Sequence, residues 1–127
     1  MIEPAPAPDH LFVYGTLRPG DVRWSFLEPF AADDGVADSV HGDLFDTGLD
    51  YPAAVFGGAR SIKGRTFRLR ADRLEEALET LDIEEDTVLG RYRRVPVTTD
   101  RGIRAWAYAY GSGLDLTPIP GGDWFGR

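Results

Sequence analysis

Short apolar runs separated by glycine and proline indicate a chain built mainly from strands. Residues 11–14 (LFVY) form a continuous apolar run that ends at Gly15, as in a buried strand followed by a turn. The same reasoning predicts five further strands, at residues 40–45, 51–56, 62–69, 92–98 and 103–110. The last of these is largely apolar at every position, so this strand should be covered on both faces.

Two segments carry apolar residues at helical spacing instead. A short helix is predicted over residues 24–30, where Pro29 limits its length. The clearest helix covers residues 72–85, and Asp72 with Glu75 resembles a capping box at its start. The apolar positions of this helix follow the spacing i, i+3, i+4 and i+7: Leu74, Ala77, Leu78 and Leu81. These positions predict one apolar stripe that faces the protein interior.

The number and order of these elements predict the fold. Turn sequences at Gly57-Gly58 and at residues 100–102 (DRG) suggest hairpin links between neighbouring strands. About six strands and two helices indicate an α+β fold, a small mixed β-barrel with two flanking helices. A single domain is expected over residues 11–127, after a mobile, Pro- and Ala-rich lead-in at residues 1–10. Trp124 and Phe125 predict that the Gly- and Pro-rich tail packs onto this domain.

Composition excludes several classes of function. The chain of 127 residues has a formal net charge of −7, which disfavours nucleic acids and anionic membranes as partners. It has no cysteine, which rules out disulfides, thiolate metal sites and cysteine nucleophiles. His10 and His41 share no metal-ligand spacing, so no metal or cofactor is expected. No signal peptide or apolar run of transmembrane length is present, and a cytoplasmic location is expected.

Glu85 is the one carboxylate that falls on the apolar stripe of the predicted helix. It lies four residues after Leu81 and seven after Leu78, whereas Glu79 points to solvent. If the helix reaches residue 85, this carboxyl group enters the apolar interior, where burial raises its pKa and makes it a candidate general acid and base. If the helix ends at Asp82, Glu85 belongs instead to an exposed acidic loop.

The turn after the first strand is a candidate anion site. Successive backbone N–H groups around a glycine can converge on a carboxylate or phosphate, and residues 14–17 (YGTL) could do so here. An ordinary turn explains the same residues. Neither a Walker A motif nor a dinucleotide-binding glycine motif is present.

Seven segments, in order along the chain, match motifs of one known family: residues 12–18 (FVYGTLR), 42–46 (GDLFD), 51–55 (YPAAV), 62–67 (IKGRTF), 81–85 (LDIEE), 92–95 (YRRV) and 119–124 (IPGGDW). Together they resemble the γ-glutamylcyclotransferase-like family, which includes γ-glutamylamine cyclotransferases and the plant avirulence-induced-gene-like proteins. The likeness spans nearly the whole chain, and the ordered set is far more specific than its opening motif.

The resemblance implies a γ-glutamylcyclotransferase-like fold and the release of 5-oxoproline from a small-molecule γ-glutamyl amine or γ-glutamyl amino acid. It also implies roles for particular residues. The backbone of Tyr14, Gly15, Thr16 and Leu17 would hold the α-carboxylate of the γ-glutamyl group. Glu85 would be the catalytic acid and base, and Tyr92 would line the substrate pocket.

Two departures from the family pattern leave other functions open. Asp86 stands where the family often has glycine, and residues 21–24 (DVRW) stand where many members carry Asn or His. One alternative is a related transferase or lyase that acts on a γ-glutamylated biosynthetic intermediate. The other is a binding module that keeps the barrel and the pocket without the chemistry. Glu at position 85 favours an enzyme.

Overall fold

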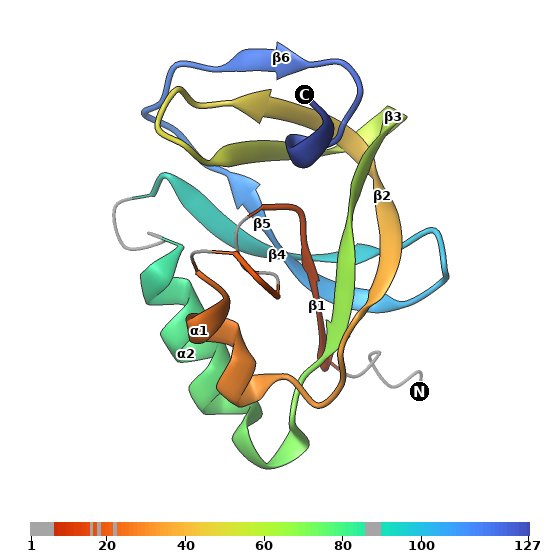
Figure 1. Cartoon of the computed structure of the whole chain (residues 1–127), viewed down its shortest axis with the longest axis vertical. Helices are drawn as coiled ribbons and strands as arrows, with labels where there is room; N and C mark the ends of the chain where they lie inside the picture. The colour runs from red at the N-terminus through yellow and green to blue at the C-terminus, as the bar shows by residue number, and fades with distance from the viewer. Residues whose placement is uncertain (1–6, 16, 18, 22, 86–89) are drawn as a thin grey trace, which may run out of the picture.

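The computed structural model describes residues 7–15, 17, 19–21, 23–85 and 90–127 (Figure 1). Most of the predicted lead-in, together with Thr16 and Asp86, lies outside the described residues. His10 already belongs to the first strand, so the end of the predicted lead-in is part of the folded sheet.

Six strands form one mixed sheet that curls into a half-barrel (Figure 1). In chain order they are β1 (His10–Val13), β2 (Val36–Asp46), β3 (Pro52–Arg68), β4 (Tyr92–Thr98), β5 (Arg104–Tyr110) and β6 (Thr117–Ile119). Their order across the sheet is β4-β5-β1-β3-β2-β6. The β1–β5 pair is parallel and the other neighbouring pairs are antiparallel. The predicted α+β fold with a small mixed barrel-like sheet is confirmed.

Two short helical segments lie together on one side of this sheet (Figure 1). The first is α1 (Trp24–Leu27), continued by a 3₁₀ turn at Glu28–Phe30. The second is α2 (Leu74–Glu84), preceded by a 3₁₀ turn at Ala71–Arg73. Among the residues that the structure describes, no helix is long and apolar enough to cross a bilayer.

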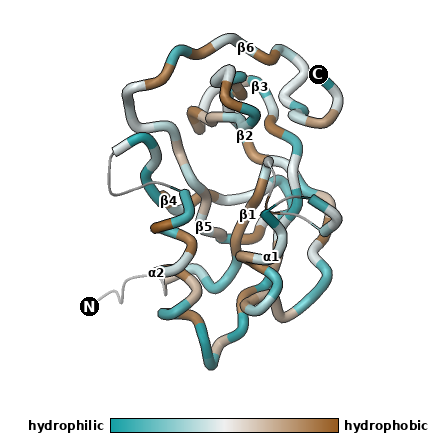
Figure 2. Tube along the Cα trace, turned by 60° about the vertical axis from the view of Figure 1, so that its left-hand side comes forward, coloured by the Kyte–Doolittle hydropathy of each residue, from teal (hydrophilic) through white to brown (hydrophobic). Residues whose placement is uncertain are grey.

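Strand β1 lies at the centre of the sheet because both of its faces are apolar. Leu11 and Val13 pack in the core on the helix side of the sheet, whereas Phe12 and Tyr14 pack in the core on the other side. Strand β5 divides in the same way, with Ala105 and Ala107 in the second core and its aromatic residues in or against the first. Figure 2 shows hydrophobic (brown) colour along the trace near β1 and β5. The prediction that β5 is covered on both faces is confirmed.

Two predicted strands form one strand in the structure, and β2 (Val36–Asp46) begins before its predicted start at residue 40. The segments predicted at 51–56 and 62–69 belong to the single strand β3, but its pairing with β2 jumps at the predicted turn. Gly42 pairs with Phe56 and its neighbour His41 pairs with Ser61, so residues 57–60 bulge out of the ladder. Gly57 and Gly58 allow this bulge because both have positive φ angles, 105° and 90°. The tail adds the strand β6, which was not predicted because its three residues show no apolar alternation.

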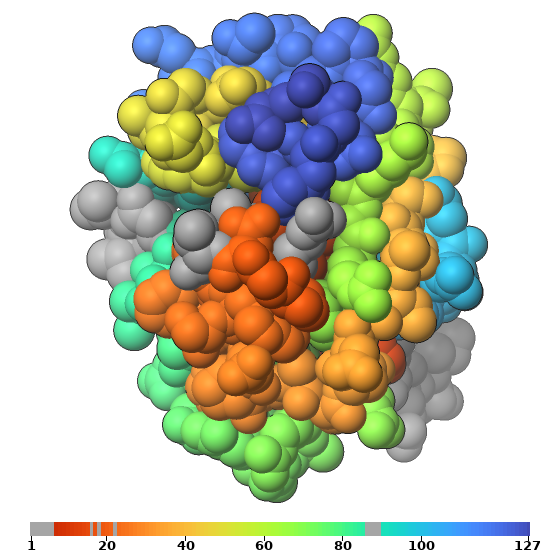
Figure 3. Space-filling model, viewed as in Figure 1, coloured from red at the N-terminus to blue at the C-terminus, as the bar shows by residue number. Residues whose placement is uncertain are grey.

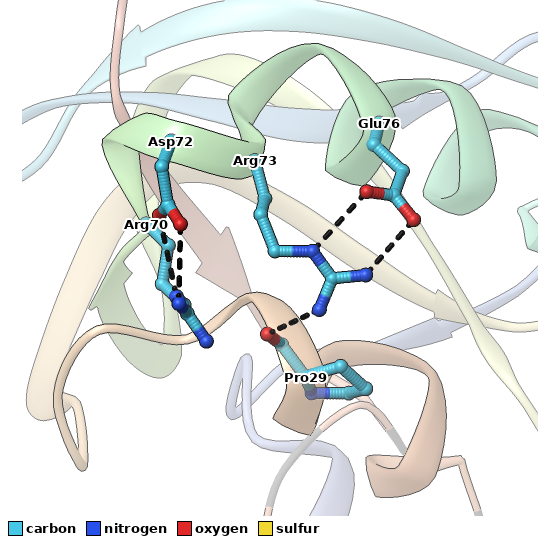
Figure 4. Close-up of polar contacts among 5 residues, drawn as sticks. All are labelled: Pro29, Arg70, Asp72, Arg73 and Glu76. Atoms are coloured by element: carbon cyan, nitrogen blue, oxygen red, sulfur yellow. Dashed lines mark hydrogen bonds and ion pairs between the residues drawn. The ribbon is translucent and has the colours of Figure 1, made fainter.

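The predicted capping box at the start of α2 is wrong. Figure 4 shows the reason: the Asp72 carboxylate pairs with Arg70, at 3.1 Å from Nη2, and lies before the helix. Arg73 occupies the cap position and has no capping side-chain bond. Its guanidinium instead binds Glu76 and the backbone carbonyl of Pro29, which joins the start of α2 to the 3₁₀ turn after α1.

The C-terminal segment packs across one end of the half-barrel, next to β2 and β3 (Figure 3). Trp124 is buried in the second core, as predicted, whereas Phe125 is 41% exposed. Gly122 makes this approach possible, because its carbonyl accepts a bond of 2.8 Å from the Lys63 N–H and its φ angle is 66°. A Cβ atom at Gly122 would lie only 1.9 Å from the Ser61 carbonyl oxygen.

Gly122→Ala should therefore lower the free energy of unfolding by about 1–3 kcal/mol, through backbone strain and overpacking. Gly121→Ala is the matched control, since a Cβ atom there meets no atom within 4 Å. Chemical denaturation of both variants measures the difference. Equal stability of the two variants would contradict the close contact with Ser61.

Candidate active site

The helical geometry of α2 extends to Glu85. Glu85 is the cap residue, and its backbone N–H donates to the Leu81 carbonyl at 2.9 Å, which continues the helical hydrogen-bond pattern. Ala77 and Leu81 are fully buried on the face that packs inward. The Glu85 side chain follows the same face and is only 13% exposed. The sequence left open whether Glu85 lies inside the protein or in an exposed loop, and in the structure its carboxyl group lies inside.

Glu85 opens into a cavity of about 370 Å³ that also contains the glycine turn. This cavity lies among the end of β1, the C-terminal end of α2 and the strands β4 and β5. Five of the six residues predicted for the site line it: Tyr14, Gly15, Leu17, Glu85 and Tyr92. The sixth, Thr16, lies outside the described residues. Residues far apart in sequence are thus brought to one place.

At one side of the cavity, the backbone turn at Gly15 lies close to the ring of Pro52. A Cβ atom at this position would lie 3.1 Å from the Pro52 ring, so a larger residue would crowd the approach of the turn to β3. The Pro52 carbonyl accepts the Tyr92 hydroxyl at 2.7 Å. The turn, the start of β3 and β4 are therefore held at a fixed separation around the cavity.

Sequence reasoning missed several lining residues, and Arg23, Tyr51 and Tyr108 matter most for the chemistry. Tyr51 precedes the proline of a matched motif, which was a usable signal. Tyr108 lies on the aromatic face of β5, where a core role and a site role have the same pattern. Arg23 belongs to the segment that departs from the family pattern, so neither periodicity nor resemblance pointed to it.

Different neighbours of Glu85 shift the pKa of its carboxyl group in opposite directions. Burial in the cavity raises the pKa of the Glu85 carboxyl group, because desolvation disfavours the ionised form. The Arg23 guanidinium lies 3.3 Å from the carboxylate and pulls the pKa down, whereas the neighbouring Glu84 raises it. The net direction is upward, which is the condition for a carboxyl group that both accepts and donates protons near neutral pH.

The tyrosine hydroxyl groups around Glu85 are already bonded to the protein. Tyr14 donates to the backbone carbonyl of Tyr108, and Tyr108 donates to the Asp82 carboxylate at 2.8 Å. Burial raises the pKa values of Tyr14, Tyr92 and Tyr108 well above the usual range, and the Glu85 charge adds to this. These side chains therefore stay protonated at neutral pH and form walls of the cavity around the Glu85 carboxyl group.

Asp82 links this wall to the helix that carries Glu85. Its carboxylate accepts the Tyr108 hydroxyl and also pairs with the Arg94 guanidinium, at 2.9 Å from Nε. The guanidinium in turn lies over the Trp106 ring, 4.3 Å from its centre. The last turn of α2 is therefore tied to β4 and β5, one helical turn before Glu85.

The described residues contain no group of three His, Asp or Glu side chains placed to hold a metal ion. The chemistry of the cavity comes from one buried carboxyl group, one guanidinium and a set of aromatic walls. Such a site can bind a small polar molecule and move a proton within it.

Glu85→Gln should raise the thermal stability of the protein at neutral pH. The folded state raises the pKa of Glu85, so the wild type loses stability as pH rises through that pKa, and a neutral amide avoids the loss. The gain should vanish at about pH 3, below the ordinary pKa of a glutamate, where the carboxyl group is protonated in both the folded and the unfolded state. Thermal unfolding at both pH values measures it, with Glu79→Gln on the exposed face of α2 as control. A variant less stable than wild type at neutral pH would mean that the contact with Arg23 outweighs the burial of the charge.

Comparisons with known proteins identify relatives over almost the full length of the chain. The family model described as "Gamma-glutamyl cyclotransferase, AIG2-like" matches residues 11–126. A Vibrio cholerae protein named "Putative gamma-glutamylcyclotransferase" is 34% identical over 118 residues, covering 92% of this chain and 96% of the relative. A Halalkalibacterium halodurans protein of the same description is 33% identical over 90 residues, covering 67% of this chain and 79% of the relative.

Solved structures share the fold. An uncharacterized protein from Pyrococcus horikoshii superposes with a TM-score of 0.67 at 26% identity, over 91% of this chain and 88% of the other. An AIG2-like protein from Mus musculus gives a TM-score of 0.53 at 18% identity, over 87% of this chain and 86% of the other. At the latter identity the likeness concerns the fold alone.

Proposed function

The chain belongs to the gamma-glutamyl cyclotransferase, AIG2-like family, and we propose that it is an enzyme that releases 5-oxoproline from a γ-glutamyl amine or γ-glutamyl amino acid. The observation that carries this proposal is the shared cavity. A buried carboxyl group with a raised pKa and the glycine turn expected to hold an α-carboxylate line the same space of about 370 Å³. Ligand sites for small molecules begin at about this size.

The proposed reaction is an attack within the substrate. The α-amine nitrogen adds to the γ-carbonyl carbon and forms the new C–N bond of a five-membered lactam. The old amide C–N bond then breaks, and the departing nitrogen leaves as an ammonium ion. The α-ammonium loses two protons in all, one before the attack and one after the new bond has formed, and Glu85 accepts them in turn and delivers them to the departing nitrogen. The carboxylate is thereby regenerated, and no electrons are exchanged with another molecule.

The protein mainly has to hold the substrate folded upon itself, since both reacting groups belong to one molecule. In this proposal the backbone of residues 14–17 fixes the α-carboxylate, with the part at Thr16 outside the described residues. Holding that carboxylate also sets the position of the α-amine next to it. Tyr92 and the other tyrosines form rigid walls, because their hydroxyl groups are held by protein acceptors.

The reaction requires no redox change and no external nucleophile, so the residues of the chain can supply its chemistry. A small-molecule substrate fits both the cavity and the negative charge of the chain, which disfavours polyanions. The absence of cysteine fits a reducing compartment, which supports a cytoplasmic location within this proposal.

The wild-type protein should form 5-oxoproline from at least one member of a panel of γ-glutamyl amino acids, γ-glutamyl amines and glutathione. Glu85→Gln should lower kcat by about 10²- to 10⁴-fold, because the amide cannot transfer the proton. Chromatographic quantification of 5-oxoproline measures both, with Glu79→Gln as a matched carboxyl-to-amide control. Full activity in Glu85→Gln would remove Glu85 from the mechanism. Tight binding of a substrate that is never consumed would favour a binding module.

The pH dependence of kcat/KM should show an acid limb set by Glu85. The ionised carboxylate is the form that accepts the ammonium proton, so activity should rise with pH. Because burial raises the pKa of Glu85, the limb should lie above the range of an ordinary glutamate. The substrate α-ammonium loses its proton at higher pH, about 8 in a peptide, which separates the two titrations. Initial rates across the acid range test this. Activity that falls as pH rises there would mean that the protonated form of Glu85, and not the carboxylate, starts the reaction.

A further inference from the structure

Arg23 contacts the last residue of α2, Glu84, and the cap residue, Glu85, through two nitrogens of its guanidinium. Its Nη2 donates to the backbone carbonyl of Glu84 at 2.7 Å, and its Nη1 lies 3.3 Å from Glu85 Oε1. The Arg23 side chain is 25% exposed and lines the same cavity as Glu85. Among the described lining residues it is the only cation.

The fold delivers Arg23 to this place through α1. Arg23 is the residue that precedes α1, and α1 packs beside α2. The last carbonyls of a helix lack partners within the helix and carry partial negative charge, so a cation there satisfies a backbone acceptor as well as a carboxylate. Only a planar guanidinium can span both acceptors with fixed geometry, since a lysine ammonium is a single point of charge.

We propose that Arg23 is a positioning residue for the acid–base step: it holds the Glu85 carboxylate at the cavity end of α2 and keeps it ionised before substrate arrives. The proposal rests on the proposed function, because it assigns Arg23 a part in the same reaction. It goes beyond the family resemblance, which gave no role to residue 23.

Among the described residues that face Glu85, only Arg23 carries a charge that stabilises the ionised carboxylate. Glu84 of the same helix and the tyrosines Tyr14, Tyr92 and Tyr108 surround the carboxylate, and none of them carries positive charge. Burial and Glu84 both favour the protonated carboxyl group, whereas Arg23 favours the ionised one. Removing the guanidinium therefore leaves burial unopposed.

Arg23→Gln should move the acid limb of kcat/KM to higher pH. An arginine beside a carboxylate typically changes its ionisation equilibrium tenfold or more, so kcat/KM at about pH 6 should fall about tenfold, with a smaller loss above the limb. Arg23→Lys keeps the charge but not the contact with both Glu84 and Glu85, so its limb should stay near that of wild type while kcat falls at every pH. Arg70→Gln is the control, because Arg70 pairs with Asp72 before the opposite end of α2.

Three results would overturn the proposal. A loss in Arg23→Gln that is the same at every pH, with the limb in place, would show that Arg23 does not set the charge of Glu85. A rise in KM alone would make Arg23 a substrate-binding residue. If Arg23→Gln fails to fold, Arg23→Lys still tests the proposal. A kcat equal to wild type in Arg23→Lys would show that the contact of the guanidinium with both Glu84 and Glu85 is not needed.

A titration without substrate separates this proposal from the proposed function. The Glu85 carboxyl carbon can be followed by NMR in ¹³C-labelled protein and assigned with Glu85→Gln. Arg23→Gln should raise the pKa of Glu85 relative to wild type, and Arg70→Gln should leave it unchanged. If no substrate yields 5-oxoproline, the proposed function fails while this titration still tests Arg23. An unmoved titration in Arg23→Gln overturns the role of Arg23, whatever the enzyme assays show.

Discussion

The carboxyl group of Glu85 lies in an apolar cavity at the end of α2, and its burial there opposes folding when the group is ionised. The rest of the structure limits this cost without removing it. Arg23 supplies a partial countercharge, and the helical hydrogen bond from Glu85 to Leu81 fixes the direction of the side chain. The result is a carboxyl group poised between two protonation states, the property that proton transfer within a substrate requires.

The two-faced sheet explains why this carboxyl group meets the glycine turn. Strand β1 is buried on both faces, so it takes a central place, next to β3 and β5, and its end points into the cavity. Tyr14 anchors that end by donating its hydroxyl to the Tyr108 carbonyl, and Tyr108 reaches across to Asp82 on α2. A continuous set of contacts thus joins the end of β1 to the helix that leads to Glu85, and it fixes the distance between them.

The burial of an ionisable carboxyl group at Glu85 lowers the stability of the fold at neutral pH. A neutral residue at position 85 would satisfy packing better, and a shorter α2 would place Glu85 in solvent at no cost. The polar links at both ends of α2, Arg73 to Pro29 and Asp82 to Arg94, hold the helix against the sheet instead. Stability gained along the helix therefore offsets the cost of burying the Glu85 carboxyl group at its end.

The sequence by itself determined the strands of the central sheet, the apolar face of α2 and the identity of Glu85, because these depend on local periodicity of 2.0 or 3.6 residues and on motifs that lie within short segments. Only the tertiary structure decided that α2 keeps its geometry as far as Glu85, that β6 closes beside β2 and that residues 57–60 leave the ladder. It also decided the partners of Glu85. Arg23 is 62 positions away in the chain and directly precedes another helix, α1. This pairing depends on which surfaces meet after packing, and no pattern within either segment encodes it.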